Sequence, residues 1–285
     1  MSGRLLIIGS DGLLGSSLYE HWYARELPVV KTRRTPDSTD DPAMLLDLAT
    51  PISSWPRFTE IKAAVLCAAV TSGERCRRDP VTTRHINVHQ SVQLAEQLIE
   101  QGAFVVFLST NAVFDGSKPW RDPDEAVCPM TEYGRQKAEA EGKFKQFGDC
   151  CAIIRLTKVV HGETPLLRGW LDDLRHQKMI VPFADLVCAP ISLEATVRAI
   201  ATVAERSLAG IWQLSARVDV TYVEIAQRLA HSRKLDDSLI RPAYCRPTAD
   251  FEHIPQHTTL NVCKSSDTLN FVTPEPLELI DTLFV

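Results

Sequence analysis

A tyrosine and a lysine four residues apart, Tyr133 and Lys137, have the types and the spacing needed to move a proton. Residues at positions i and i+4 of a helix lie on one face, so both side chains can reach the same ligand. The pKa of a free tyrosine is about 10, and a neighbouring ammonium group lowers it because it stabilises the phenolate. The pair therefore predicts a site at which Tyr133 exchanges a proton and Lys137 adjusts its pKa.

A hydroxyl group directly after a buried strand is the second candidate. Residues 104–108 (FVVFL) are all large and apolar, which is typical of a strand buried on both faces, and Ser109 and Thr110 follow. Either hydroxyl could donate a hydrogen bond to a carbonyl oxygen and polarise it. With a cofactor that carries hydride, these groups form a site for proton-coupled hydride transfer, in which Tyr133 supplies the proton and Thr110 orients the oxygen.

The elements that position such a site begin with a glycine-rich turn near the N-terminus. Residues 5–8 (LLII) predict a buried strand, and apolar residues recur at helical spacing from Leu14 to Trp22. The turn between them carries Gly9, Gly12 and Gly15. In a dinucleotide-binding fold, such glycines allow a tight turn and the close approach of a pyrophosphate, which the free N–H groups of the helix N-terminus attract.

The end of the second predicted strand indicates which dinucleotide is bound. Residues 27–30 predict that strand, and they run into Lys31, Arg33 and Arg34. At this point of the fold an acidic residue binds the ribose 2′-hydroxyl of NAD, whereas basic residues accept the 2′-phosphate of NADP. The basic residues therefore predict NADP, with NADPH preferred over NADH. A basic surface loop is the alternative interpretation.

Strands and helices alternate along the first 150 residues. Further buried strands are predicted at 63–69 and 151–156, and a long helix at 80–101. This alternation predicts the α/β class, as a Rossmann-type doubly wound parallel sheet. Ligands bind beyond the carboxyl ends of such strands, which would bring the glycine turn, Ala68, Ala69 and Thr110 around one crevice.

Prolines and shorter elements after residue 160 predict a smaller C-terminal lobe. We expect a cofactor-binding domain at 1–160, completed by about 185–215, and a substrate-binding lobe at about 161–184 and 216–285. Helices are predicted at 193–205 and near 277–283, and a strand at 211–214. Thr221 and Glu224 have the spacing of a capping box, which predicts a helix start there. The stretch that contains Pro242, Pro247 and Pro255 should be rich in loops.

Composition excludes several classes of protein. The net charge of -5 offers no basic excess for nucleic acid, and no apolar stretch reaches the roughly 18 residues of a membrane span. The eight cysteines lack the spacing of a zinc site, so we expect no metal and reduced thiols in a cytoplasmic protein.

The chain resembles the extended short-chain dehydrogenases/reductases, and within them the sugar nucleotide-binding dTDP-4-dehydrorhamnose reductase group. The matching segments extend over most of its length: GSDGLLG (9–15), AAVTSGERCRRDP (68–80), Asn87, STNAVFDG (109–116), YGRQK (133–137), IIR (153–155) and GIWQLS (210–215). The resemblance implies an oxidoreductase of carbohydrate biosynthesis whose substrate is a nucleotide-diphosphate sugar.

Residue roles follow from this resemblance. Thr110, Tyr133 and Lys137 would form the catalytic trio, and Asn87 would support the backbone of the active site. The expected cofactor-binding residues are Gly9, Asp11, Gly12, Leu13, Leu14, Gly15, Arg33, Arg34, Asp47, Leu48, Ala68, Ala69, Asn87, Tyr133 and Lys137. Of these, Asp47 and Leu48 would lie near the adenine. The expected substrate-binding residues are Thr71, Asn111, Ala112 and Val113.

Two segments depart from the group. Asn111 and Ala112 replace the Asp-Tyr that usually follows the threonine, and residues 155–159 (RLTKV) lack the usual tryptophan. Because both regions touch the sugar in the group, its identity stays open. The Asp-Glu pair with which sugar-nucleotide 4,6-dehydratases expel water is also missing after Thr110.

Three functions are compatible with the sequence. The first is an NADP-dependent reductase or dehydrogenase that acts on a keto nucleotide-diphosphate sugar. The second is a non-catalytic, NADP-binding regulatory subunit, because the β subunit of methionine adenosyltransferase has a similar fold and similar motifs. The third is an epimerase, which needs tightly held NAD. The direction of the reaction and the assembly, including a homodimer, stay open.

Overall fold

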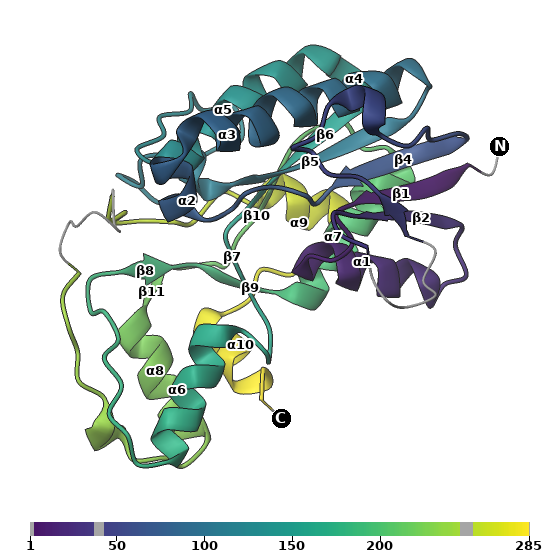
Figure 1. The fold of residues 1–285 in the computed structure, drawn as a ribbon. Helices are drawn as coiled ribbons and strands as arrows, with labels where there is room; N and C mark the ends of the chain where they lie inside the picture. Colours follow the sequence, from purple (N-terminus) through teal and green to yellow (C-terminus); the bar gives the residue numbers. More distant parts are fainter. Residues whose placement is uncertain (1–2, 37–42, 246–252, 285) are drawn as a thin grey trace. The chain divides into compact units, whose positions relative to one another are not determined.

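A seven-stranded sheet is the largest sheet in the computed structural model, which describes residues 3–36, 43–245 and 253–284 (Figure 1). The strand order is β10-β6-β5-β4-β1-β2-β3. The strands are β1 (Arg4–Ile8), β2 (Val29–Arg33), β3 (Met44–Leu45), β4 (Ile61–Leu66), β5 (Phe104–Thr110), β6 (Cys151–Leu156) and β10 (Gly210–Leu214). From β3 to β5 neighbouring strands pair in parallel, and the order reverses between β1 and β4. The predicted Rossmann-type doubly wound sheet is confirmed.

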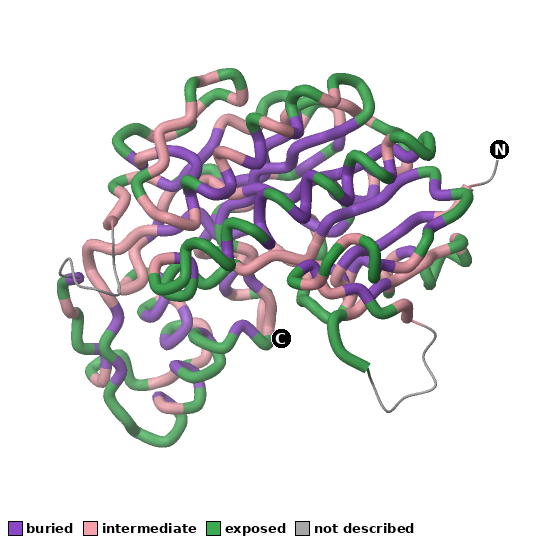
Figure 2. The backbone as a smooth tube through the Cα atoms, turned by 45° about the horizontal axis from the view of Figure 1, so that its top comes forward, coloured by how far each residue is buried: buried purple, intermediate pink, exposed green. Residues whose placement is uncertain are grey.

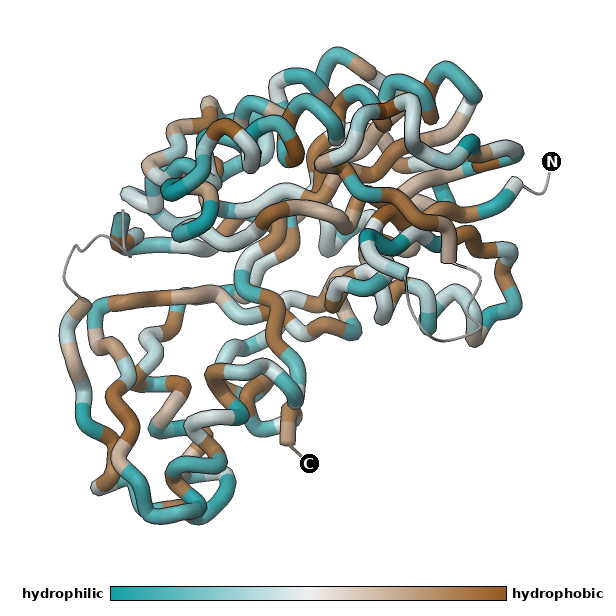
Figure 3. Tube along the Cα trace, viewed as in Figure 1, coloured by the Kyte–Doolittle hydropathy of each residue, from teal (hydrophilic) through white to brown (hydrophobic). Residues whose placement is uncertain are grey.

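Helices cover both faces of this sheet, which explains why its inner strands are uniformly apolar. Figure 1 shows α3, α4 and α5 over one face and α1 and α7 over the other. The helices are α1 (Leu13–Tyr23), α2 (Gly73–Arg78), α3 (Pro80–Arg84), α4 (Ser91–Glu100), α5 (Glu132–Phe144) and α7 (Leu193–Arg206). The tube views show the strands as buried (Figure 2) and largely hydrophobic (Figure 3).

Several boundaries differ from the sequence prediction. Strand β2 begins at Val29 and ends at Arg33, so Lys31 lies inside it, paired with Ile7 of β1. The prediction ended this strand too early because it followed apolar residues only, whereas pairing with β1 also holds polar ones. Strand β4 ends at Leu66, and the predicted helix at 80–101 contains a π-helical segment, η2 (His85–Gln90), between α3 and α4.

The chain divides into two compact units. The first comprises Met1–Val113, Val127–Arg155 and Val197–Trp212, and the second Phe114–Ala126, Leu156–Thr196 and Gln213–Val285. Compared with the expected division, residues 114–126, 156–160, 185–196 and 213–215 belong to the second unit. That one unit binds a cofactor and the other a substrate stays a prediction.

The second unit has its own apolar core, which includes Leu171, Ile225, Leu229 and Ile280. Its elements are β7 (Lys158–Val160), α6 (Pro165–Arg175), β8 (Val187–Cys188), β9 (Pro190–Ser192), β11 (Val220–Thr221), α8 (Tyr222–Ser232), α9 (Cys263–Leu269) and α10 (Pro276–Thr282). Strand β7 pairs in parallel with β9, and β8 in antiparallel with β11. Short turns of 3₁₀ helix complete the two units: η1 (Ile52–Ser54), η3 (Asn111–Val113), η4 (Lys145–Cys150) and η5 (Asp237–Leu239).

The predictions for the C-terminal part had mixed outcomes. The capping box is confirmed, because the hydroxyl of Thr221 accepts the N–H of Glu224 at 3.1 Å and the Glu224 carboxylate accepts the N–H of Thr221 at 2.7 Å. Helix α9, which ends at the left-handed Asn270, lies in a stretch that was expected to be loop. Pro247 lies outside the described residues. Within the described ranges, no helix is both long and apolar enough to cross a membrane.

Candidate active site

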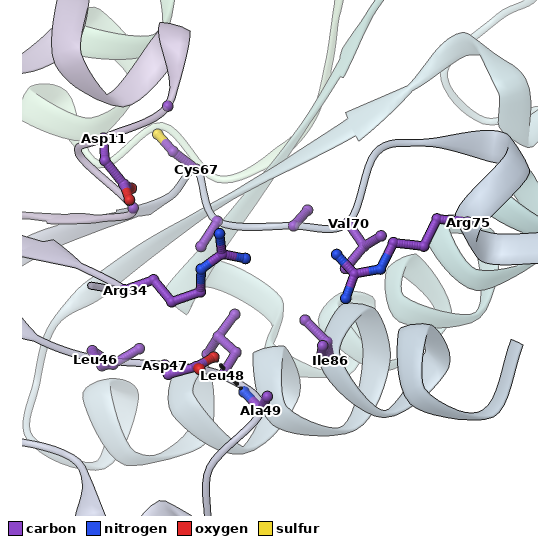
Figure 4. Close-up of a pocket in the computed structure, with 14 residues that line it drawn as sticks. Asp11, Arg34, Leu46, Asp47, Leu48, Ala49, Cys67, Val70, Arg75 and Ile86 are labelled. Carbon is purple, nitrogen blue, oxygen red and sulfur yellow. Dashed lines mark hydrogen bonds between the residues drawn. The ribbon is translucent and has the colours of Figure 1, made fainter. Parts of the chain in front are cut away.

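A pocket of about 460 Å³ lies in the first unit, beyond the carboxyl ends of β1, β2 and β4 (Figure 4). Most of its lining comes from four chain segments: the glycine turn with Gly9, Asp11 and Gly12, then Arg34, residues 46–49, and residues 67–70. Eight of the predicted cofactor-binding residues lie in these segments. Sequence reasoning missed Leu46, Ala49, Cys67, Val70, Arg75 and Ile86, which line the same pocket.

The glycine turn has the geometry that close approach of a ligand needs. Gly9 has φ +86, and a Cβ there would collide with Ala68. A Cβ on Gly15 would overlap the carbonyl oxygen of Gly9, so only glycine lets α1 pack on the turn. A Cβ on Gly12, in contrast, would make only an ordinary contact of 3.7 Å with the carbonyl oxygen of Gly9, and Gly12 precedes α1 without a side-chain cap. The first N–H groups of α1, from Leu13 and Leu14, are therefore available to an anion.

The basic residues in β2 and directly after it lie in two places. The side chain of Arg34 extends into the pocket (Figure 4). Arg33 and Lys31 instead line a separate hollow of about 490 Å³, where the Lys31 ammonium lies 3.7 Å from the ring centre of Tyr19. Thr32 between them is fully buried, and its hydroxyl accepts the N–H of Gly9 at 3.1 Å. Because successive side chains point to opposite sides, the neighbouring residues Arg33 and Arg34 line different pockets.

The segment around Asp47 is held by hydrogen bonds within the protein. Its carboxylate accepts the N–H of Ala49 at 2.9 Å, and its carbonyl accepts the indole N–H of Trp55 at 3.0 Å. Gln90 on η2 donates to the carbonyl of Thr50 at 2.9 Å. These hydrogen bonds hold the part of the pocket wall formed by residues 46–49 in place without a ligand.

Asn87 holds the loop after β4 rather than lining the pocket. Its amide oxygen accepts the N–H of Val70 at 2.8 Å, and its amide nitrogen donates to the carbonyl of Val70 at 2.9 Å. The same nitrogen donates to Gln136 at 2.9 Å, and Gln136 donates in turn to the hydroxyl of Thr83 at 2.9 Å. Gln136 is fully buried and links α5 to the pocket wall. Sequence reasoning missed it, although it stands next to Lys137.

Helix α5 brings Tyr133 and Lys137 against the end of β5. Gly134 lies so close to the carbonyl oxygen of Ala112 that a Cβ would overlap it, which fixes the start of α5 on the turn that follows Thr110. One turn later, the buried ammonium group of Lys137 donates to the carbonyl of Leu108 at 2.6 Å. The predicted trio is thus drawn from two elements that pack directly on each other.

Burial affects the two ionisable members of the trio differently. Desolvation raises the pKa of Tyr133, so its phenol keeps its proton at neutral pH. Desolvation lowers the pKa of Lys137 to about 8, while the negative charge of Glu141 acts in the opposite direction. The pKa of Tyr133 is thus raised by burial and not lowered by Lys137 as the sequence predicted, while the pKa of Lys137 itself falls to about 8.

The structure distinguishes between the two candidate hydroxyls. Ser109 is buried and donates to the carboxylate of Glu141 at 2.5 Å, and that carboxylate forms a fully buried ion pair with Arg155 at 2.7 Å. Thr110 is only half-buried, and its hydroxyl accepts the N–H of Ala112 at 3.2 Å. The Thr110 hydroxyl also donates to the side-chain oxygen of Asn111 at a long 3.5 Å, and a ligand oxygen can replace that weak bond, so Thr110 is the one that can serve a ligand.

The predicted substrate-binding residues lie in two segments. Thr71 is exposed in the loop after β4, and Asn111, Ala112 and Val113 form η3. The side chain of Val113 is fully buried, and its carbonyl accepts the N–H of Cys128 at 2.9 Å. Val113 thus supports the turn from inside the unit, and Asn111 and Ala112 are its more accessible members.

Two features are typical of the extended short-chain dehydrogenases/reductases, the class of NAD(P)-dependent oxidoreductases predicted from the sequence. They are a glycine turn at the carboxyl end of β1 in a parallel sheet, and a tyrosine and a lysine on the helix that packs on β5. The family model described as "RmlD substrate binding domain" matches residues 3–281, and the chain belongs to this family. The resemblance stated from the sequence is confirmed.

Three relatives illustrate the range of the similarity. Methionine adenosyltransferase 2 subunit beta from Xenopus laevis is 25% identical over 86% of this chain and 77% of its own length. A dTDP-4-dehydrorhamnose reductase from Sinorhizobium fredii is 29% identical over 57% of this chain and 58% of its own. The crystal structure of dTDP-4-dehydrorhamnose reductase from Bacillus anthracis in complex with NADP has a TM-score of 0.82 at 19% identity, and covers 100% of this chain and 98% of the other.

Proposed function

We propose that the protein binds NADP(H) in the pocket of the first unit and reduces a keto nucleotide-diphosphate sugar, or oxidises the corresponding alcohol. The observation that carries this proposal is the packing of α5 on the end of β5, where Gly134 lies against the carbonyl of Ala112 and Lys137 donates to the carbonyl of Leu108. Because β4 and β5 are parallel, the carboxyl end of β5 lies at the same edge of the sheet as the pocket.

The residues of the pocket fit a dinucleotide. Gly12, which lines the pocket without a side chain, and the uncapped start of α1 suit a pyrophosphate, and the guanidinium group of Arg34 suits a 2′-phosphate. Ala68 and Ala69 are small enough for a ligand to lie against the end of β4. The NADP in the similar structure from Bacillus anthracis supports this assignment. When bound, the cofactor supplies the hydride.

The protein's own part in the reduction is to handle the proton and the oxygen. Thr110 donates a hydrogen bond to the carbonyl oxygen of the substrate, and Tyr133 gives that oxygen its phenol proton as the carbon receives hydride. Because its pKa is raised, the phenol of Tyr133 is protonated before the reaction. The ammonium group of Lys137 stabilises the phenolate that remains after the proton has been transferred. The turn Asn111–Val113 carries no carboxylate, so it lacks the acid and base that expulsion of water needs.

A nucleotide-diphosphate sugar is the substrate that the family membership favours. The proposal predicts that NADPH absorbance falls in a single turnover with at least one member of a panel of keto nucleotide sugars. Tyr133→Phe should slow that step by about a hundredfold or more, the usual effect of losing a general acid. Tyr222→Phe is the matched control, because Tyr222 is a half-buried tyrosine of the second unit that is hydrogen-bonded to Cys188. Binding of cofactor and nucleotide sugar without any hydride transfer would contradict the proposal.

A non-catalytic regulatory subunit is the second candidate. The similarity to methionine adenosyltransferase 2 subunit beta supports it, because that similarity extends over 86% of this chain. This alternative predicts that the protein binds NADPH, leaves it unoxidised with every sugar of the panel, and co-elutes with a methionine adenosyltransferase catalytic subunit on a sizing column. Turnover together with separate elution would exclude it.

A further inference from the structure

Arg75 extends into the pocket from α2, opposite the segment that carries Arg34. Figure 4 shows Asp11 and Cys67 on one side of the pocket, Arg75 and Ile86 on the other, and the guanidinium group of Arg34 between them. Within residues 3–36, 43–245 and 253–284, neither Arg34 nor Arg75 has a side-chain hydrogen bond or ion pair. Both guanidinium groups can therefore interact with a ligand.

The backbone that carries Arg75 is held in place on both sides. Before it, Asn87 binds both backbone groups of Val70, and the hydroxyl of Ser72 accepts the N–H of Arg75 at 3.2 Å. After it, the fully buried Cys76 donates its thiol to the carbonyl of Val70 at 3.5 Å. The side-chain nitrogen of Asn87 lies 3.9 Å from the sulfur of Cys76, so Asn87 contacts the residues that hold the backbone before and after Arg75. Arg75 is thus presented to the pocket by a preformed segment.

The surroundings of Arg75 suit a flat aromatic base better than a phosphate group. The neighbouring lining residues Val70 and Ile86 are apolar, and Leu48 on the facing wall is buried. Groups that favour phosphate, namely the glycine turn and Arg34, lie elsewhere in the same pocket (Figure 4). A guanidinium plane stacks well on an aromatic ring, and an apolar neighbourhood strengthens that contact because it excludes water.

We propose that Arg75 closes the pocket by stacking its guanidinium group on the adenine base of the bound nucleotide. The inference rests on the proposed binding of NADP(H) and divides the work between two arginines. Arg75 recognises the base, which NAD and NADP share, whereas Arg34 recognises the 2′-phosphate, which only NADP carries. Arg75 therefore sets affinity for both cofactors, and Arg34 sets the choice between them.

Calorimetry with two fragments tests this division. ADP carries the base without a 2′-phosphate, and adenosine 2′,5′-bisphosphate carries both. Arg75→Ala should weaken the binding of both fragments by the same factor, about tenfold. Arg75→Tyr, which restores a stacking plane without charge, should bind both within about threefold of the unchanged protein. Arg34→Ala should weaken only the bisphosphate. Arg78→Ala is the matched control, since Arg78 lies on the same helix but pairs with Glu74.

Each other outcome overturns the inference in a recognisable way. Unchanged affinity of Arg75→Ala for both fragments would show that Arg75 does not contact the nucleotide. A loss confined to the bisphosphate would make it a phosphate ligand, and an Arg75→Tyr variant as weak as Arg75→Ala would exclude stacking. If the unchanged protein binds neither fragment, the proposed cofactor fails, and this inference fails with it. Thermal melts of each variant check that the fold is retained.

Discussion

Breaking the buried ion pair between Glu141 and Arg155 should strongly destabilise the first unit. The Glu141 side chain is 1% exposed and the Arg155 side chain 0% exposed. Arg155 donates to the two carboxylate oxygens at 3.0 and 2.7 Å, and Ser109 donates to the same carboxylate at 2.5 Å. Glu141→Gln removes the charge that compensates the buried guanidinium group. Loss of one partner of a buried pair costs about 3–5 kcal/mol of unfolding free energy.

A matched control lies on the same helix. Glu139 of α5 pairs with Arg84 at 2.7 Å, but these side chains are 29% and 53% exposed. Water screens such a pair, so Glu139→Gln should leave the stability nearly unchanged. Urea denaturation and thermal melts, both followed by circular dichroism, measure the two variants under the same conditions. The thermal midpoint of Glu141→Gln should fall by roughly 10 °C, and that of Glu139→Gln by far less.

A third variant separates charge from packing. Changing Glu141 and Arg155 to leucine and Ser109 to alanine removes the carboxylate together with the guanidinium and hydroxyl groups that donate to it. Such a replacement is often neutral or stabilising, so the triple variant should be more stable than Glu141→Gln. Equal stability of Glu141→Gln and Glu139→Gln would refute the reasoning, because it would mean that water reaches the pair.

Three further predictions concern the reaction site. Lys137→Met should weaken NADPH binding and abolish turnover, whereas Tyr133→Phe should abolish turnover with cofactor affinity nearly intact; equal affinities of the two variants would contradict this division of roles. Replacing Arg33 and Arg34 together by alanine should remove most of the preference for NADPH over NADH. The loss of binding free energy for NADPH should be about 1.5–3 kcal/mol, the value of one charge-assisted phosphate contact, and Arg34→Ala alone should cause the larger share. Calorimetry with both cofactors measures these affinities. Because burial lowers the pKa of Lys137 to about 8, the unfolded chain binds more protons than the folded one between pH 8 and about 10.4. The unfolding free energy of the unchanged protein should therefore rise relative to that of Lys137→Met as pH increases through this window, by at most about 1.4 kcal/mol per pH unit. If urea denaturation gives the same difference between the two proteins at every pH, the lowered pKa of Lys137 is excluded.

Much of the fold and the main chemical groups could be predicted from the sequence because their signals are local. An apolar run before the glycine turn predicts β1, since a strand covered on both faces needs apolar side chains throughout. The spacing of Tyr133 and Lys137 predicts a shared helix face, since helical geometry depends only on distance along the chain. The capping box at Thr221 is local for the same reason.

Only the tertiary structure decided which of several similar residues face a ligand. Ser109 and Thr110 are equivalent in sequence, but Glu141 on another element occupies the first and leaves the second accessible. The loop that leads to Arg75 is held by Asn87, which lies twelve positions later and binds both backbone groups of Val70. Such choices are made by hydrogen bonds between elements distant in the chain, and a local pattern contains no information about which elements meet.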